Sequence, residues 1–131
     1  MTESGIKTHP SQPSAQELID VIGEALLEKK AENIRLLDVR KITTLTDYFV
    51  VCNGLSDTQV KALGDSVLES VKGTFGEHVW RKEGHNTNRW IVLDYVNVVV
   101  HIFMKDLRDF YGVEKMWRDA EVSEIKDEPT E

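Results

Sequence analysis

The sequence lacks the features that mark secreted, membrane-spanning and disulfide-bonded proteins. It contains one cysteine among 131 residues, so Cys52 can form neither an internal disulfide nor a zinc cluster, and its apolar neighbours predict a buried thiol. No basic region followed by an apolar one opens the chain, which argues against a secretion signal and leads us to expect a cytoplasmic protein. The most apolar run, residues 89–104, is too short and too often interrupted by polar residues to span a bilayer.

Basic residues are also scarce. Lys and Arg number 16 against 23 Asp and Glu, which gives a formal net charge of -7. A broad nucleic-acid-binding surface needs clustered Lys and Arg, so we expect no direct sequence-specific binding to nucleic acid. The negative charge suits a basic partner instead, such as a ribosomal protein or a polyamine. A hydrophobic content of 40% over this length is ordinary for one soluble globular domain.

Residues 89–104 predict two adjacent strands with the turn between them at Asp94–Asn97. If the turn consists of Val96 and Asn97, the side chains divide between two faces of the sheet. One face is almost purely aliphatic and is predicted to be core, with Leu93 and Val100 almost fully buried. A slip of one residue in the register would exchange the two faces. The other face has mixed polarity and is the first place to look for function; it carries Trp90, Val92, Asp94, Val99, His101 and Phe103.

The rest of the pattern predicts an α/β domain. Ser14 and Glu17 form a capping box before apolar residues at helical spacing over residues 14–30. Ser56 with Gln59 repeats that signal before a second helix, which is expected to stop at Gly73. Further strands are expected at 34–39, 47–53 and 78–82, and short helical turns at 106–111 and 113–117, on either side of Gly112. This order predicts a mixed sheet of about five strands with helices packed on it. The domain is expected to span residues 14–120, between a disordered N-terminal tail at 1–13 and an acidic, disordered C-terminal tail at 121–131.

Candidate catalytic groups are few. Cys52 lies within a strand and Ser56 is accounted for as a helix cap, so no nucleophile is paired with a histidine. Asp94 and His101 are diagonal neighbours in the register above, within reach of a hydrogen bond, and a carboxylate-oriented imidazole is half of a hydrolytic triad. A buried polar pair and two residues at a binding face are the competing interpretations. Without a nucleophile, the pair does not make a catalytic site.

Two loops are weak candidates for ligand binding. Gly54–Ser56 joins a buried strand to a capped helix, which favours anions, but Asp57 opposes a phosphate there and no Walker lysine or GxGxxG accompanies the loop. His78 and His85 flank a loop that contains Glu83, yet their spacing matches no zinc pattern. We therefore expect no metal, cofactor or catalytic residue. A nucleotide-utilising enzyme that acts at the Gly54–Ser56 loop is kept as the alternative function.

Four segments of the chain stand out as motifs. They are TDYFVVCNGLSDTQVKAL at 46–63, EG at 83–84, WIVLDYVNVVVHIF at 90–103 and FYGVEKMW at 110–117. In this order they resemble the ribosomal silencing factor family (RsfS, also called Iojap-like). The resemblance implies a single mixed α/β domain with a topology distantly similar to nucleotidyltransferases. The paired-aspartate metal motif of active transferases is missing after the Gly54–Ser56 loop, so nucleotide transfer is not implied.

The resemblance implies a non-enzymatic function. Members of the family bind the large ribosomal subunit through its ribosomal protein fourteen, block joining of the small subunit and so quiet translation when nutrients are short. The free protein is expected to be a homodimer. The family's interface tryptophan corresponds to Trp90. Other positions that match the motifs, and are candidate contacts with the ribosomal protein, are Glu83, Asp94, His101, Tyr111, Glu114 and Trp117.

Two positions depart from the family pattern. Val96-Asn97 replaces the usual Gly-Asp, which conflicts with the two-residue turn because valine resists positive φ. Gly112 occupies a variable position and is expected to loosen the last helical turn.

Overall fold

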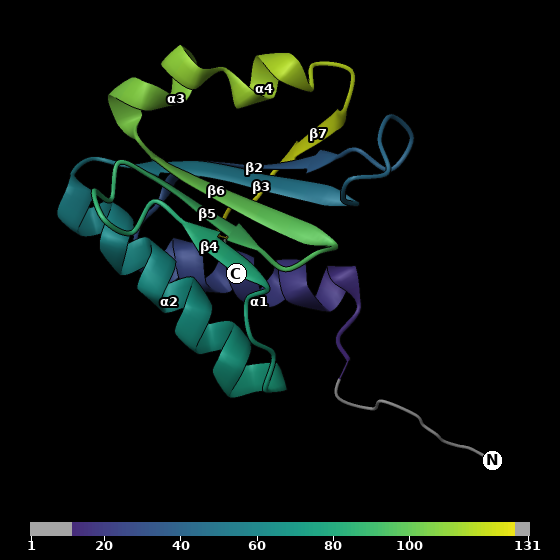
Figure 1. Ribbon diagram of the computed structural model, residues 1–131, viewed down its shortest axis with the longest axis horizontal. Coiled ribbons are helices and arrows are strands. Elements are labelled where there is room, and N and C mark those ends of the chain that lie inside the picture. Colours follow the sequence, from purple (N-terminus) through teal and green to yellow (C-terminus); the bar gives the residue numbers. More distant parts are fainter. Residues whose placement is uncertain (1–11, 128–131) are drawn as a thin grey trace.

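One mixed sheet, with six strands in the order β4-β5-β6-β3-β2-β7, runs through the computed structural model, which describes residues 12–127. Strands β3 and β6 are parallel and all other neighbours are antiparallel. Helices α1 and α2 cover one face of the sheet, and α3 and α4 lie on the other (Figure 1). The predicted α/β class is therefore confirmed, with six strands rather than five. The strands are β2 (Glu32–Asp38), β3 (Tyr48–Gly54), β4 (Arg81–Glu83), β5 (Trp90–Asp94), β6 (Val98–Met104) and β7 (Glu121–Glu124), and the helices are α1 (Ala15–Glu28), α2 (Asp57–Phe75), α3 (Lys105–Tyr111) and α4 (Val113–Met116).

The central hairpin β5–β6 has the predicted register. Trp90 lies opposite Phe103 and Leu93 lies opposite Val100, which places the aliphatic face toward α1 and α2. Leu93 and Val100 are both completely buried. Burial of a large aliphatic side chain contributes roughly 1.5–3 kcal/mol, so this face holds the two helices against the sheet.

The β5–β6 turn is the predicted two-residue turn, and it contains a strained residue. Val96 has a φ of +77°, a conformation that β-branched side chains rarely adopt. The N–H of Asn97 donates to the Tyr95 carbonyl at 3.0 Å, which makes Val96 the centre of a γ-turn. Asp94 accepts from the Val96 N–H at 2.8 Å, and the Thr46 hydroxyl donates to the Val96 carbonyl at 2.8 Å. These side chains hold the turn closed although its sequence does not favour it.

Replacing Val96 with glycine is therefore expected to stabilise the protein. Positive φ costs a non-glycine residue about 1–3 kcal/mol, and glycine relieves this strain. Glycine also loses more conformational entropy on folding, which reduces the gain in stability by up to about 1 kcal/mol. We expect a net gain of about 1 kcal/mol and a rise in the melting temperature of about 3 °C or more. Asn97→Gly is the matched control, because Asn97 is not among the residues with positive φ. A melting temperature that falls in both variants would show that Val96 is not strained.

The C-terminal segment corrects one expectation. The predicted disorder from Glu121 onward does not hold for Glu121–Glu124, because these residues pair with β2 as strand β7. The N–H of Ile125 then donates to the Ile34 carbonyl at 2.9 Å, and its side chain packs on the core beside Gly23 of α1. Composition shows the acidic character of this segment but not the free edge of β2 that gives its backbone partners. The predicted N-terminal tail lies outside the described residues over positions 1–11.

Two element boundaries also differ from the predictions. Helix α2 continues through Gly73 and ends at Gly76, whose φ of +69° is the left-handed conformation that closes many helices. The strand expected at 78–82 is the shorter β4, although the N–H of Trp80 already donates to the Asp94 carbonyl at 2.9 Å. Neither difference moves the central hairpin. Among the described residues, no helix has the length and apolar character needed to cross a membrane.

Candidate binding face

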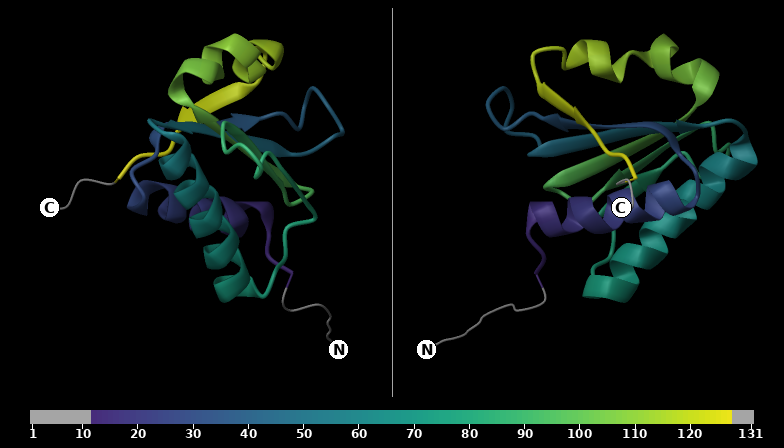
Figure 2. Two further views of the ribbon diagram at one scale, coloured as in Figure 1. Left: turned by 60° about the vertical axis from the view of Figure 1, so that its left-hand side comes forward. Right: turned by 180° about the vertical axis from the view of Figure 1, so that it is seen from behind.

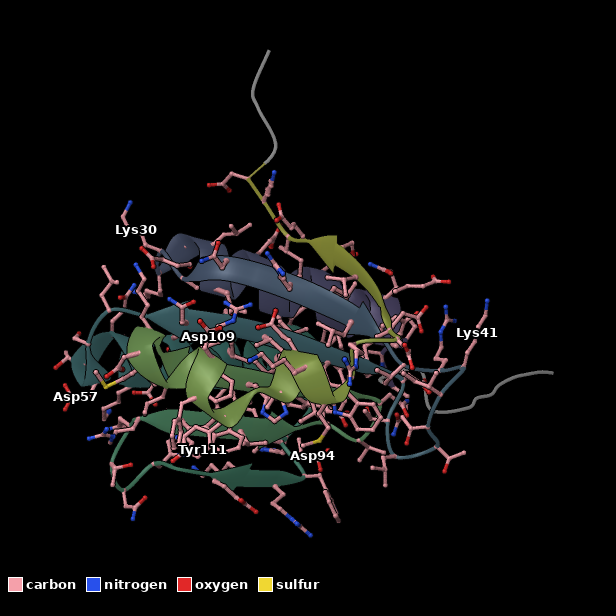
Figure 3. The ribbon with its side chains drawn as sticks, turned by 90° about the horizontal axis from the view of Figure 1, so that it is seen from above. Lys30, Lys41, Asp57, Asp94, Asp109 and Tyr111 are labelled. Atoms are coloured by element: carbon pink, nitrogen blue, oxygen red, sulfur yellow. The ribbon has the colours of Figure 1, made fainter. Side chains whose placement is uncertain are left out.

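The predicted contact residues meet on the sheet face that carries α3 and α4. These helices lie over the middle of the sheet and leave β4 and β5 in view beside them (Figure 3). Tyr111 lies at the border between helix and open sheet, and Asp94 at the far end of β5. The uncovered face of β4 and β5, together with the adjoining surface of α3 and α4, is called the binding face below.

Trp90 is held on this face by three partners. Its ring lies 4.9 Å from that of Phe103 and 4.6 Å from that of Tyr111. Its Nε1 donates to Nδ1 of His101 at 3.1 Å. Phe103 is completely buried beneath it, whereas Trp90 itself is only half-buried. The indole is thus fixed in one orientation while part of it stays accessible, and a contact made by such a side chain loses little conformational entropy.

His101 supports Trp90 as a neutral imidazole. Burial lowers the pKa of His101 to about 4, so the ring is uncharged at neutral pH. Because the indole N–H can only donate, Nδ1 of His101 must accept and the ring proton lies on Nε2. A protonated His101 has no acceptor left for Trp90.

Mild acid is therefore expected to destabilise the protein through His101. The folded-state pKa lies below the ordinary histidine value, so the unfolded chain binds more protons as the pH falls. The stability contribution is complete above pH 6.5 and declines toward the folded pKa of about 4. Between pH 7 and pH 5.5 we expect a loss of about 1 kcal/mol, measured by urea denaturation, and a smaller loss in His101→Gln. Equal losses in both proteins would assign the pH dependence to other groups.

The hypothetical Asp94–His101 pair does not form. His101 lies directly opposite Val92, and among the described hydrogen bonds the carboxylate of Asp94 accepts from the Val96 N–H, while His101 bonds Trp90. The prediction that the two residues share a face is correct, but Asp94 closes the turn rather than orienting an imidazole. The half-triad interpretation is wrong.

The Glu83-Gly84 motif borders Trp90. Glu83 lies opposite Val92 on the binding face, is exposed, and has Arg81 at 3.8 Å. Gly84 has a φ of +90°, and a Cβ at this position would overlap the carbonyl oxygen of Trp90. Glycine therefore allows the β4–β5 loop to lie against the start of β5, which sets the position of the tryptophan.

Glu114 belongs to a polar network that the sequence did not reveal. It accepts from Nε and Nη2 of Arg108 at 2.8 and 3.1 Å, and these bonds hold the pKa of Glu114 below its usual value. Nη1 of the buried Arg108 also donates to the Asn33 carbonyl and to Oδ1 of Asn53, each at 2.8 Å. The network fastens α3 and α4 to the ends of β2 and β3. Its only sequence signal is an arginine and a glutamate six positions apart, which is not the spacing of a helical pair.

Two exposed apolar residues of the FYGVEKMW motif were not singled out by the sequence. Phe110 is 77% exposed and Met116 is 71% exposed, and Tyr111 between them is 46% exposed. Trp117 has a different role, because its ring lies 5.4 Å from that of Phe49 in the core beneath α4. The motif thus combines two residues that pack in the core, Val113 and Trp117, with an apolar outer surface.

The remaining candidates are placed away from any common site. Burial raises the pKa of the Cys52 thiol to about 12, so it is not a nucleophile. In the loop after β3, Ser56 accepts from the Gln59 N–H and the Leu55 N–H donates to Oε1 of Gln59, so two of the amides that an anion could use are occupied. Within residues 12–127, no three His, Cys, Asp or Glu side chains are grouped for a metal, His78 and His85 included.

The chain matches a known protein family. Residues 12–131 fit the family model described as RsfS, ribosomal silencing factor during starvation. A ribosomal silencing factor from Halalkalibacterium halodurans is 38% identical over 113 residues, which are 86% of this chain and 96% of that protein. The chloroplastic protein Iojap of Zea mays is 31% identical over 79% of this chain and 45% of that protein.

A solved structure agrees with the fold. The crystal structure of a protein from Chromobacterium violaceum superposes with a TM-score of 0.78 at 33% sequence identity, over 90% of this chain and 92% of that one. The two proteins therefore share one fold over most of both chains.

Proposed function

Since the chain belongs to the ribosomal silencing factor (RsfS) family, we propose that it binds the large ribosomal subunit through ribosomal protein fourteen and blocks joining of the small subunit. The chain is a ribosomal silencing factor, and the family consists of non-enzymatic regulators of translation. The observation that carries the proposal is Trp90, which is accessible on the binding face and fixed by three side chains. Tryptophan is enriched among the residues that dominate binding energy, because it removes a large area from water and has few rotamers to fix.

The surface around Trp90 has the composition of a protein interface. Tyr111, Phe110 and Met116 extend the apolar area across α3 and α4, and exposed Glu83 lies at its border. An apolar centre with a polar rim is the usual organisation of such contacts. The net charge of -7 favours the approach of a basic ribosomal protein.

In this proposal, three of the predicted contact residues support the interface without touching the partner. His101 is buried and acts through Trp90, and Glu114 acts by fixing α3 and α4 through Arg108. Asp94 shapes the β5–β6 turn at one end of the face. We expect direct contact from Trp90, Tyr111 and Glu83.

Binding and its consequence can be tested together. The chain is mixed with purified large subunits and sedimented, and light scattering then follows joining after small subunits are added. We expect bound chain in the pellet and a joining signal that falls in proportion to it. Binding without any effect on joining would contradict the proposed block of subunit joining. Calorimetry with isolated ribosomal protein fourteen tests whether that protein is the contact on the large subunit.

Phe110→Ser is expected to weaken large-subunit binding about fivefold, which corresponds to about 1 kcal/mol at the edge of a hot spot. Folding should not change, because Phe110 is 77% exposed. Leu45→Ser is the matched control, since Leu45 is 76% exposed on the β2–β3 loop, which belongs to none of β4, β5, α3 and α4. If the two variants bind equally well, α3 is not part of the contact with the large subunit.

Homodimer formation in the absence of ribosomes belongs to the same proposal. An apolar face of this kind favours self-association when its partner is missing. Analytical ultracentrifugation over a concentration series tests it, and we expect Phe110→Ser to shift the protein toward monomer. We also propose that the protein acts in the cytoplasm, where ribosomes are assembled from subunits.

A further inference from the structure

A groove runs between α1 and the C-terminal strand, on the opposite face of the sheet from the binding face. The chain beyond β7 comes down onto α1 there (Figure 2). A hollow of about 560 Å³ lies along this contact. It shares Gln16, Leu36 and Ser123 with a hollow of about 310 Å³ on one side. It shares Leu27 and Ile125 with one of about 260 Å³ on the other. The three hollows form one continuous surface, the α1–β7 groove.

The groove stays open because of the residues that β7 turns toward α1. Ser123 lies opposite Leu36 of β2, whose side chain packs on the core beneath the sheet. A large aliphatic residue at position 123 would fill the space above α1, whereas serine leaves it empty. The floor is apolar, formed by Ile19, Leu27, Leu36 and Ile125.

The rim of the groove is acidic. Asp20 and Glu24 of α1 border it on one side, and Glu124 and Asp127 border it on the other. Lys126 is the cation at this rim, and its Nζ lies 3.0 Å from Oε1 of Glu124. Within residues 12–127, Asp20 and Glu24 take part in no ion pair. Carboxylates of one sign along a partly enclosed groove concentrate a negative potential there.

We propose that the α1–β7 groove binds an extended basic peptide segment of a second protein, with aliphatic side chains on the apolar floor and Lys or Arg side chains at the acidic rim. From Gln16 to Leu27 the helix rises about 16 Å, the length of about five residues of extended chain. Alternating side chains of such a segment meet floor and rim in turn. The binding face lies on the other side of the sheet, so both surfaces can be occupied at once.

The probe for this site is a capped peptide of alternating lysine and leucine, seven residues long, labelled for fluorescence anisotropy. The full chain is titrated into it at two salt concentrations, and amide chemical shifts of Gly23, Glu24 and Ser123 are followed by NMR. We expect saturable binding that weakens with salt and shifts at these three amides. A peptide in which glutamate replaces lysine should not bind.

Two pairs of variants locate the site. Ser123→Leu fills the groove without a change of charge and is expected to weaken peptide binding at least tenfold, whereas Thr44→Leu, a similar addition on the exposed β2–β3 loop, should have no effect. Glu24→Lys should weaken peptide binding at least tenfold, and Asp109→Lys, an equal charge change on α3 across the sheet, by less than twofold. Unchanged binding in Ser123→Leu, or no saturable binding to the wild type, would overturn the proposal.

Other occupants give distinct results. If Ser123→Leu alters the sedimentation coefficient of the chain alone, the groove is a contact between copies. If Ile6→Ser shifts the amides of Gly23 and Ser123 without peptide, the N-terminal segment of the chain occupies it. Either result would overturn the proposal. None of these measurements involves ribosomes, so the groove and the binding face are tested independently.

Discussion

Trp90→Ala is expected to weaken binding to the large ribosomal subunit about thirtyfold or more, which corresponds to about 2 kcal/mol. The substitution removes the accessible part of the indole and also its ring contact with Tyr111. The variant should stay folded, because Trp90 is only a partly buried neighbour of the smaller core cluster and the main core lies on the opposite sheet face. Circular dichroism and ribosome sedimentation on the same sample measure folding and binding.

Two further substitutions separate contact from structure. Trp80→Ala removes a tryptophan that is 63% exposed just before β4, and it should leave binding unchanged. Trp90→Phe keeps an aromatic ring but loses the N–H that donates to His101, so we expect an intermediate loss. A Trp90→Ala protein that is folded and binds as tightly as wild type would exclude Trp90 from the interface, and one that unfolds would make it a core residue.

Arg108→Met is expected to destabilise the protein by about 2–3 kcal/mol, because two neutral acceptors and the partly buried carboxylate of Glu114 lose their donor. Glu114 loses two hydrogen bonds, and the Asn33 carbonyl and Oδ1 of Asn53 each lose their described donor. Arg35→Met is the control. It lies 3.7 Å from Glu114 but is 44% exposed, so its removal should cost less than about 1 kcal/mol.

Acid provides an independent measurement of the same network. The pKa of Glu114 lies below its ordinary value of 4.5, first because of the hydrogen bond from Arg108. Its contribution is therefore present above pH 4.5 and is lost as the pH falls through the lower folded-state value. Urea denaturation should show this loss in the wild type and a smaller one in Arg108→Met. The double variant Arg108→Met with Glu114→Gln should recover part of the stability at neutral pH. A single variant as stable as wild type would contradict a structural role for the pair.

The local sequence determined the parts of this protein that depend on periodicity. Alternation over residues 89–104 sets which side chains of β5 and β6 face the core, since a strand exposes successive residues on opposite faces. Ser14 and Ser56 mark the starts of α1 and α2 because each supplies an acceptor to a free backbone N–H. The same alternation placed Trp90, His101 and Phe103 on one face, and the family motifs indicated which face matters.

Only the tertiary structure decided what joins elements distant in the sequence. Strand β7 exists because the edge of β2 offers backbone partners to a segment whose composition predicts disorder. Arg108 meets Asn33 and Asn53 only after α3 has folded back over the sheet. Valine disfavours the positive φ of the turn at Val96. The turn forms because Thr46, fifty positions away, and Asp94 make hydrogen bonds to the Val96 backbone. The partner of His101 is Trp90 rather than Asp94, since Asp94 closes the turn and the indole N–H lies at Nδ1 of His101. Hydrogen bonds between residues far apart in the chain have no periodic signature, and for that reason the sequence alone could not reveal them.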